Sequence, residues 1–149
     1  MIRETESLNI KGTPEEIYEE WWKLEEFPRY LNSLKSVEWI DAEHSRWIAQ
    51  GPLGKTVEWI AEITRDDTNR RVGWKTVEGD IKTSGQVTFN ALPQGFTEVT
   101  VILHIEPPAG ALGEALTNIF RNPQKILYES MYNFKNAFEG RQERLPENK

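Results

Sequence analysis

Apolar and polar side chains alternate through the middle of the chain, between Lys35 and Ile105. This alternation is typical of strands in an antiparallel sheet that buries one face. The sequences between the alternating segments are too short for helical crossovers, so consecutive strands are expected to pair as a meander. The apolar positions of the six predicted strands are Val37 and Trp39; Trp47 and Ala49; Val57, Trp59, Ala61 and Ile63; Val72 and Trp74; Val87 and Phe89; and Val99, Val101, Leu103 and Ile105.

Before this region, a strand over residues 3–11 is followed by a segment with helical spacing. Thr13 supplies an N-cap, Pro14 suits the first helical position, and Glu16 can complete a capping box. A proline at position 28 disfavours helical geometry in the residue before it, so we expect this helix to end near Glu26. A short helical turn is expected over residues 27–31.

The C-terminal region predicts two further helices. A Pro-Pro-Ala-Gly sequence at 107–110 ends the sheet, and residues 111–120 have the spacing of a small amphipathic helix. The last helix begins at Asn122-Pro123 and is expected to end near Phe138, with Gly140 as its C-cap. Its apolar stripe consists of Leu127, Met131, Phe134 and Phe138.

Together these elements predict an α+β fold. A curved antiparallel sheet of seven strands has one apolar face, and the long C-terminal helix has one apolar stripe, so the two must cover each other. Two short helices follow the first strand. We expect a single domain over residues 1–140 and a polar tail over residues 141–149. A curved sheet around a helix can leave a cavity, and the pattern leaves open whether protein side chains fill it.

The composition fits one domain and removes several classes of function. The chain has 149 residues, and its 24 acidic and 18 basic side chains give a formal charge of −6. This acidic balance argues against nucleic acid or an anionic membrane as the main partner. The absence of cysteine excludes disulfides, thiolate metal sites and cysteine nucleophiles. No apolar run approaches the roughly 18 residues of a membrane-spanning helix, so we expect a cytoplasmic protein.

Several short sequences along the chain form a recognisable set. They are Thr13-Pro14-Glu15-Glu16-Ile17-Tyr18, Phe27-Pro28-Arg29-Tyr30, Gly51-Pro52-Leu53-Gly54, Val57-Glu58-Trp59 and Pro107-Pro108-Ala109-Gly110. Together they resemble the START-like polyketide cyclase/dehydrase family, and the similarity extends over residues 4–138. The superfamily includes coenzyme-Q-binding START proteins and proteins like the birch pollen allergen. The resemblance implies a helix-grip fold with an apolar cavity between sheet and C-terminal helix. It implies no reaction, because the superfamily contains carriers, sensors, allergens and enzymes.

Large rings on the predicted inner face of the sheet are the main candidates for ligand contact. They offer much apolar area at low entropic cost, and five of them on one concave face are hard to pack without voids. The alternative is that each ring belongs to an ordinary core. The candidates are Trp39, Trp47, Trp59, Trp74 and Phe89, with Leu127 and Met131 on the last helix.

Other residues are candidates for orienting or enclosing a ligand. The hydroxyls of Thr76 and Thr83 are placed to hold a ligand oxygen, although threonine also simply favours strands. On the small helix at 111–120, Leu112, Leu116 and Phe120 form either a gate or a plain apolar cover.

The sequence contains little that suggests catalysis or a cofactor. His44 and His104 lie far apart without metal-ligand spacing, so we expect neither a metal nor another cofactor. The catalytic residues, if any, stay unknown. Ile48 and Ile60 break the polar register and are candidates for an outer apolar patch at a homodimer contact.

Three functions are consistent with these observations. The first is binding of a small hydrophobic molecule (lipid, quinone or polyketide-like) between sheet and helix. The second is a cyclase or dehydratase acting on an aromatic polyketide-like substrate. The third is an interaction or regulatory domain with a filled core, which a cavity below roughly 300 Å³ would favour.

Overall fold

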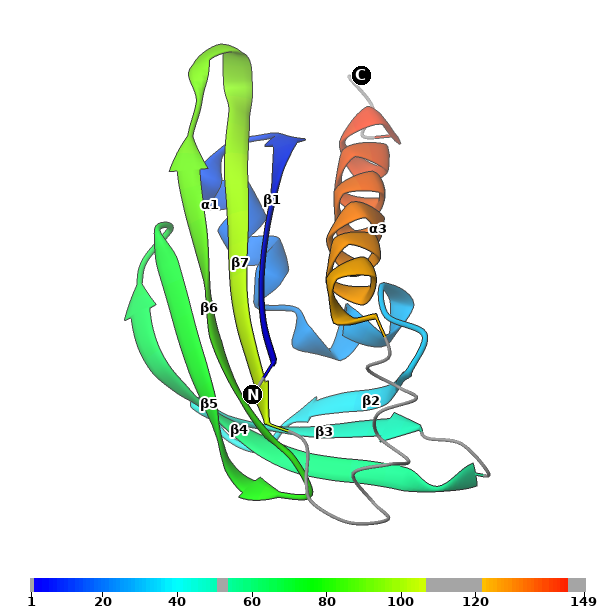
Figure 1. The fold of residues 1–149 in the computed structure, drawn as a ribbon. Helices are drawn as coiled ribbons and strands as arrows, with labels where there is room; N and C mark the ends of the chain where they lie inside the picture. Colours follow the sequence, from blue (N-terminus) through cyan, green and yellow to red (C-terminus); the bar gives the residue numbers. More distant parts are fainter. Residues whose placement is uncertain (1, 51–53, 107–121, 145–149) are drawn as a thin grey trace.

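The computed structural model describes residues 2–50, 54–106 and 122–144 (Figure 1). Every segment with alternating apolar positions forms a strand, which confirms the predicted seven-stranded sheet. The strands are β1 (Ile2–Lys11), β2 (Leu34–Trp39), β3 (His44–Gln50), β4 (Thr56–Asp67), β5 (Arg71–Gly79), β6 (Lys82–Ala91) and β7 (Phe96–Glu106), and the helices are α1 (Pro14–Trp21) and α3 (Pro123–Arg144), with 3-10 turns η1 (Leu24–Arg29) and η3 (Pro93–Gly95).

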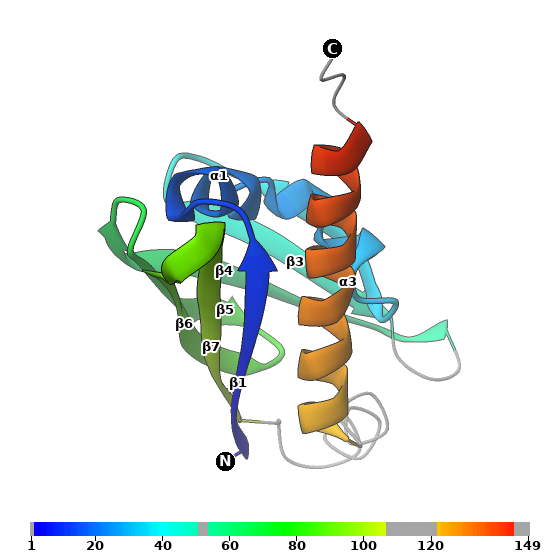
Figure 2. The same ribbon diagram turned by 90° about the horizontal axis from the view of Figure 1, so that it is seen from above.

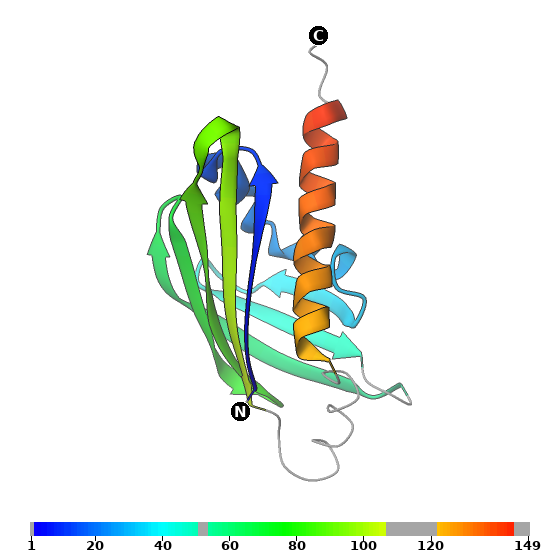
Figure 3. The ribbon, with the colours of Figure 1, turned by 45° about the horizontal axis from the view of Figure 1, so that its top comes forward.

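The sheet is antiparallel throughout and has the order β1-β7-β6-β5-β4-β3-β2. Strands β2 to β7 form the predicted meander, and β1 closes the row by pairing with β7 along its full length. The sheet curls, and α3 runs along its open, concave side (Figure 3). Seen from above, α1 lies across the end of the sheet beside β6 (Figure 2). This is the α+β helix-grip arrangement that the sequence predicted.

Helix α1 begins as expected and ends earlier than expected. The Thr13 hydroxyl accepts a hydrogen bond from the Glu16 backbone at 3.2 Å, and the Glu16 carboxylate accepts one from the Thr13 backbone at 3.0 Å. The prediction that the helix ends near Glu26 is wrong, because Lys23 leaves helical geometry (ψ 62°). The chain then continues as η1, which begins three residues before the turn predicted over residues 27–31. It buries Leu24 in a core group with Leu34 and Val37 of β2.

Helix α3 also differs from its predicted length. Its apolar stripe is buried as predicted, but the helix continues past Phe138 to Arg144, so Gly140 is not a C-cap. One reason is that Arg141 forms ion pairs with Glu20 and Glu26 and donates a hydrogen bond to the Tyr30 hydroxyl at 3.1 Å. These contacts attach the last turns of α3 to the α1–η1 segment. The predicted helix at 111–120 and the residues 51–53 lie outside the described part of the chain.

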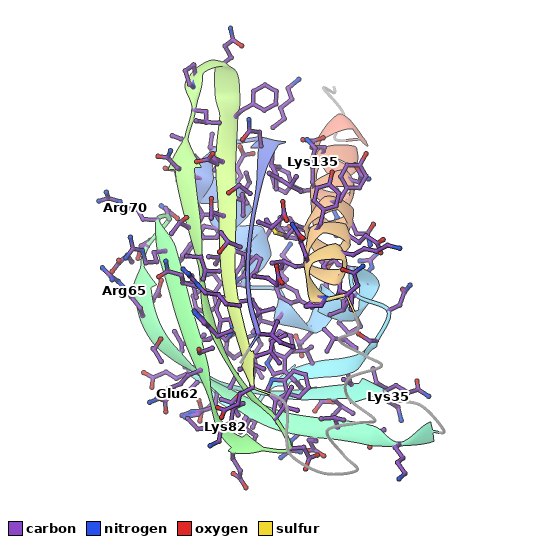
Figure 4. All side chains as sticks on the ribbon, viewed as in Figure 1. Lys35, Glu62, Arg65, Arg70, Lys82 and Lys135 are labelled. Atoms are coloured by element: carbon purple, nitrogen blue, oxygen red, sulfur yellow. The ribbon has the colours of Figure 1, made fainter. Side chains whose placement is uncertain are left out.

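The outer face of the sheet is mostly charged. Glu62, Arg65 and Arg70 lie on the side away from α3 (Figure 4). Ile48 and Ile60, the candidates for an outer apolar patch, are cross-strand neighbours of Glu58 and Arg46 and are therefore only diagonal to each other. Both are half-buried. A homodimer contact there stays a prediction.

Candidate functional site

Three rows of side chains cross the concave face of β3, β4 and β5 at its more strongly bent end. In one row Trp47 pairs with Trp59, and in another Ile63 pairs with Trp74. Between them lies a row of small residues, in which Ser45 pairs with Ala61 and Ala61 with Thr76. Thr83 on β6 extends that row through a hydrogen bond between its hydroxyl and that of Thr76 at 3.1 Å. We call Ser45, Ala61, Thr76 and Thr83 the small-residue row.

A cavity of about 210 Å³ lies over Ser45, Ala61 and Thr83 of the small-residue row, and Thr76 does not line it. Its walls are the indoles of the flanking rows, the rings of Trp21, Phe27 and Tyr30 from the α1–η1 segment, and the apolar stripe of α3. The side chains of this row are too short to reach α3, so the space between the indoles and the helix is left open. The sequence therefore makes a hollow by placing short side chains between long ones.

The indoles that form the walls are held by other rings. Trp47 and Trp59 stack with centroids 5.9 Å apart and planes inclined by 15°. Phe27 meets Trp47 edge-on at 5.7 Å, and Trp21 meets Trp74 at 6.2 Å. Such contacts add about 0.5–1.5 kcal/mol per pair to the effect of area burial. The walls are therefore fixed without a ligand.

A glycine on β6 makes room for one of these indoles. Gly85 is the cross-strand partner of Trp74, and a β-carbon at position 85 would lie 2.8 Å from the indole ring. Any larger residue would displace the ring or the strand. The absence of a side chain at Gly85 thus lets Trp74 lie close against the sheet as a wall of the cavity.

Three hydroxyls on the cavity wall have partners within the protein. The Ser45 hydroxyl accepts a hydrogen bond from the Trp47 indole N–H at 2.8 Å, and the Ser130 hydroxyl donates to the Ile126 carbonyl at 2.7 Å. The Tyr30 hydroxyl accepts from Arg141. Among the lining residues that the structure describes, none is Asp, Glu, His, Lys or Arg. The described wall therefore offers an uncharged, largely apolar environment.

Six of the predicted site residues lie on this wall. The sheet contributes Trp47, Trp59, Trp74 and Thr83, and α3 contributes Leu127 and Met131. Leu112, Leu116 and Phe120 lie outside the described residues. That these side chains bind a ligand stays a prediction.

Three other predicted residues do not line the cavity. Trp39 stacks on Trp22 at 5.7 Å, at the far edge of the sheet. Phe89 is covered by α1, where it meets the rings of Tyr18 and Trp21 edge-on. Thr76 lies beside Thr83 on the neighbouring strand, and its hydroxyl accepts the Thr83 backbone N–H at 2.9 Å.

Sequence reasoning missed other parts of the wall. The cavity is also lined by Trp21, Phe27, Tyr30 and Phe134. The sequence placed these residues in helical segments and gave no signal that they face a cavity. Ser45 is buried on the inner face, although an isolated serine in a strand gives no signal. Ser45 lies two residues from Trp47, and the same spacing separates Ala61 from Trp59 and Thr76 from Trp74. This repeated spacing is the sequence signal for a small residue beside each indole.

A second, polar hollow of about 400 Å³ lies where β5 and β6 diverge beyond Lys75 and Ser84. It is larger than the apolar cavity, but charged side chains of strand ends form its wall. Thr83 is the one described residue common to both walls. The described charged residues of this hollow are Lys75, Lys82, Glu78 and Glu106, and His104 also lines it.

His44 is the centre of a separate group of titratable side chains on the outer side. Its Nδ1 lies 2.9 Å from Asp41 Oδ1, and its Nε2 lies 3.1 Å from Glu62 Oε2. The hydrogen bond with Asp41, and then the one with Glu62, raises the pKa of His44. Over residues 2–50, 54–106 and 122–144, no group of three His, Asp or Glu side chains is arranged to hold a metal ion. No helix in these ranges is long and apolar enough to cross a membrane.

Comparisons with known proteins place these features in a family. The family described as polyketide cyclase/dehydrase and lipid transport matches residues 10–131. A curated relative, an uncharacterized 17.2 kDa protein of Streptomyces lincolnensis, is 28% identical over 107 residues, which are 72% of this chain and 71% of the relative.

Solved structures match almost the whole chain. A Deinococcus radiodurans protein is 30% identical, with a TM-score of 0.73 over 93% of this chain and 99% of its own. The Zhui aromatase/cyclase of Streptomyces sp. R1128 is 11% identical, with a TM-score of 0.75 over 94% of both chains, and this likeness concerns the fold alone. The match of the family model over most of the residues that form the sheet, the cavity and the first turns of α3 shows that the chain belongs to the polyketide cyclase/dehydrase and lipid transport family.

Proposed function

We propose that the protein binds a small, uncharged, apolar molecule in the cavity between the small-residue row and α3. The observation that carries this proposal is a preformed hollow whose described wall holds rings and aliphatic side chains but no charged group. Binding is driven by the removal of apolar surface from water, about 25 cal/mol per Å². The family description, which includes lipid transport, supports the same class of ligand.

The two alternatives have less support. A cyclase or dehydratase needs an acid or a base within reach of its substrate. The described cavity wall has no carboxylate or imidazole, and its one tyrosine hydroxyl, that of Tyr30, already accepts a hydrogen bond from Arg141. A filled core is favoured by the volume of about 210 Å³, which lies below the roughly 300 Å³ of ordinary ligand sites. However, a cavity of about 150 Å³ is known to take up benzene, so this one still has room for a small guest.

Thermal unfolding with added ligands tests the proposal. We expect an uncharged panel (naphthalene, menadione, 1-dodecanol) to contain at least one compound that raises the melting temperature. A compound at tenfold its Kd stabilises by about 1.4 kcal/mol, or roughly 3–6 °C for a domain of this size.

Two variants give the test its control. Ala61→Leu fills the floor of the cavity and should remove the ligand-induced shift. Ala91→Leu makes the same change at an exposed position on β6 and should retain it. Equal shifts in both variants, or no shift with any compound in the unmodified protein, would count against binding in this cavity. Cytoplasmic localisation and homodimerisation stay predictions from the sequence.

A further inference from the structure

We infer that the guest is a compact, uncharged molecule of one or two rings that carries a hydroxyl group, and that this hydroxyl bonds to Thr83. The inference rests on the proposed function, and it names the class of ligand. A protein with this ligand class differs from proteins that bind long acyl chains or molecules with several fused rings. Three observations support it: the volume of the cavity, the shape of its floor, and the hydrogen bonds of Thr83.

The volume sets how much of a guest the cavity encloses. A cavity of about 150 Å³ accommodates benzene, which has six carbon atoms. In proportion, the cavity of about 210 Å³ here encloses about eight non-hydrogen atoms. A single substituted ring fits within that number, and two fused rings come close to it. A long acyl chain or a tetracyclic molecule exceeds it.

The floor of the cavity favours a ring over a flexible chain. The small-residue row forms a trough with Trp47 and Trp59 on one side and Trp74 on the other. These indoles are already packed against other rings, so their positions do not depend on the guest. A rigid ring that enters this trough loses little conformational entropy and contacts aromatic surface on both sides.

Thr83 lines the wall and is able to orient such a ring. Thr76 Oγ1 accepts the Thr83 backbone N–H at 2.9 Å and shares one hydrogen bond with Thr83 Oγ1 at 3.1 Å. A hydroxyl has one donor and two acceptor sites. Whichever threonine donates in the shared bond, Thr83 Oγ1 keeps at least one lone pair that can accept a hydrogen bond from a guest hydroxyl.

Three of the other wall hydroxyls already have partners in the protein. Ser45 accepts the indole N–H of Trp47, Ser130 donates to its own helix, and Tyr30 accepts from Arg141. A guest hydroxyl that met only the apolar part of the described wall would lose its bonds with water, which makes such an orientation unfavourable. A hydrogen bond to Thr83 therefore favours a guest that carries a hydroxyl and directs it toward β6.

Isothermal titration calorimetry with three probes tests this inference. Indane has two fused rings and no oxygen, 5-indanol adds one hydroxyl and is uncharged at neutral pH, and 1-hydroxypyrene is a larger phenol with four fused rings. We expect 5-indanol to bind about two- to tenfold more tightly than indane, the range for one net hydrogen bond. We expect 1-hydroxypyrene to bind at least tenfold more weakly than 5-indanol.

Two threonine variants identify the hydroxyl contact. Thr83→Val keeps the shape of the wall and should remove the preference for 5-indanol while the affinity for indane is unchanged. Thr88→Val, on the outer face of the same strand, should keep the preference. Tightest binding of 1-hydroxypyrene, or a preference that survives Thr83→Val, overturns the inference but leaves the proposed function in place. If neither these probes nor the earlier panel binds, the proposed function itself fails.

Discussion

The concave face of the sheet is solidly packed at one end and hollow at the other, although both ends are rich in large rings. At the packed end, Val87, Phe89 and Ile17 are buried in one core group under α1. At the hollow end, Trp59 and Trp74 face a cavity across Ala61. The two ends use similar side chains with opposite results.

The difference shows that the neighbours of a large ring, and not its size, decide whether it packs or encloses space. Phe89 is met by two rings of α1 at centroid distances of 5.8 and 6.4 Å, so its edges are in contact with protein. The inner neighbours of Trp47, Trp59 and Trp74 along each strand are Ser45, Ala61 and Thr76. Short side chains there prevent the rings from being covered from all sides.

Replacing the packed ring should have the largest effect. Phe89→Ala removes a buried ring from a region without free space, so we expect a loss of about 3–5 kcal/mol in the free energy of unfolding. Urea denaturation measures this loss. A loss below about 2 kcal/mol would mean that the packed end is not closely filled, and the comparison between the two ends would then fail.

Replacing a wall indole should cost less. Trp59 stacks on Trp47, but part of its surface faces the cavity, so Trp59→Ala should cost about 2 kcal/mol, below the usual range for a fully packed ring. The same variant should lose most of its affinity for the ligand. Both quantities are measured on one preparation, by urea denaturation and by calorimetry. A stability loss equal to that of Phe89→Ala would indicate that Trp59 is ordinary core.

Removing the contacts of Arg141 tests how much the attachment of α3 to the α1–η1 segment contributes to stability. Arg141→Ala removes the ion pairs with Glu20 and Glu26, and we expect a loss of about 1 kcal/mol because these groups are partly exposed. Lys125→Ala is the control, since its pair with Glu129 is far more exposed and 3.8 Å long. Urea denaturation of both variants should show a measurable loss only for Arg141→Ala.

The smallest effect concerns pH on the outer side of the hollow end. The hydrogen bonds of His44 with Asp41 and Glu62 raise its pKa in the folded protein. The stability that these bonds contribute is therefore fully present below the unfolded value of about 6.5 and is lost as the pH rises through the raised folded value. An NMR titration should place the midpoint of His44 above about 6.5, and Asp41→Asn should lower it. A midpoint unaffected by Asp41→Asn would contradict this assignment.

Much of the fold was predictable because its signals are local. The period-two pattern of β4 from Val57 to Ile63 defines a strand without knowledge of its neighbours, and Thr13, Pro14 and Glu16 define the start of α1. The end of α1 was not predictable, because its early stop lets Leu24 pack against strands that follow later in the chain. The length of α3 likewise depends on contacts of Arg141 with residues more than 110 positions away.

For the candidate site, the sequence identified the indoles of Trp47, Trp59 and Trp74 as inward-facing, and it did so because inward and outward positions alternate along a strand. It did not reveal that Phe89 is covered, since the position of α1 above β6 is a tertiary contact. It also did not reveal that Ser45, Ala61 and Thr76 form one row, because the register between strands is set only when they pair. The sequence therefore determined which side chains face inward, whereas the pairing of strands and the placement of α1 and α3 decided where those side chains leave a cavity.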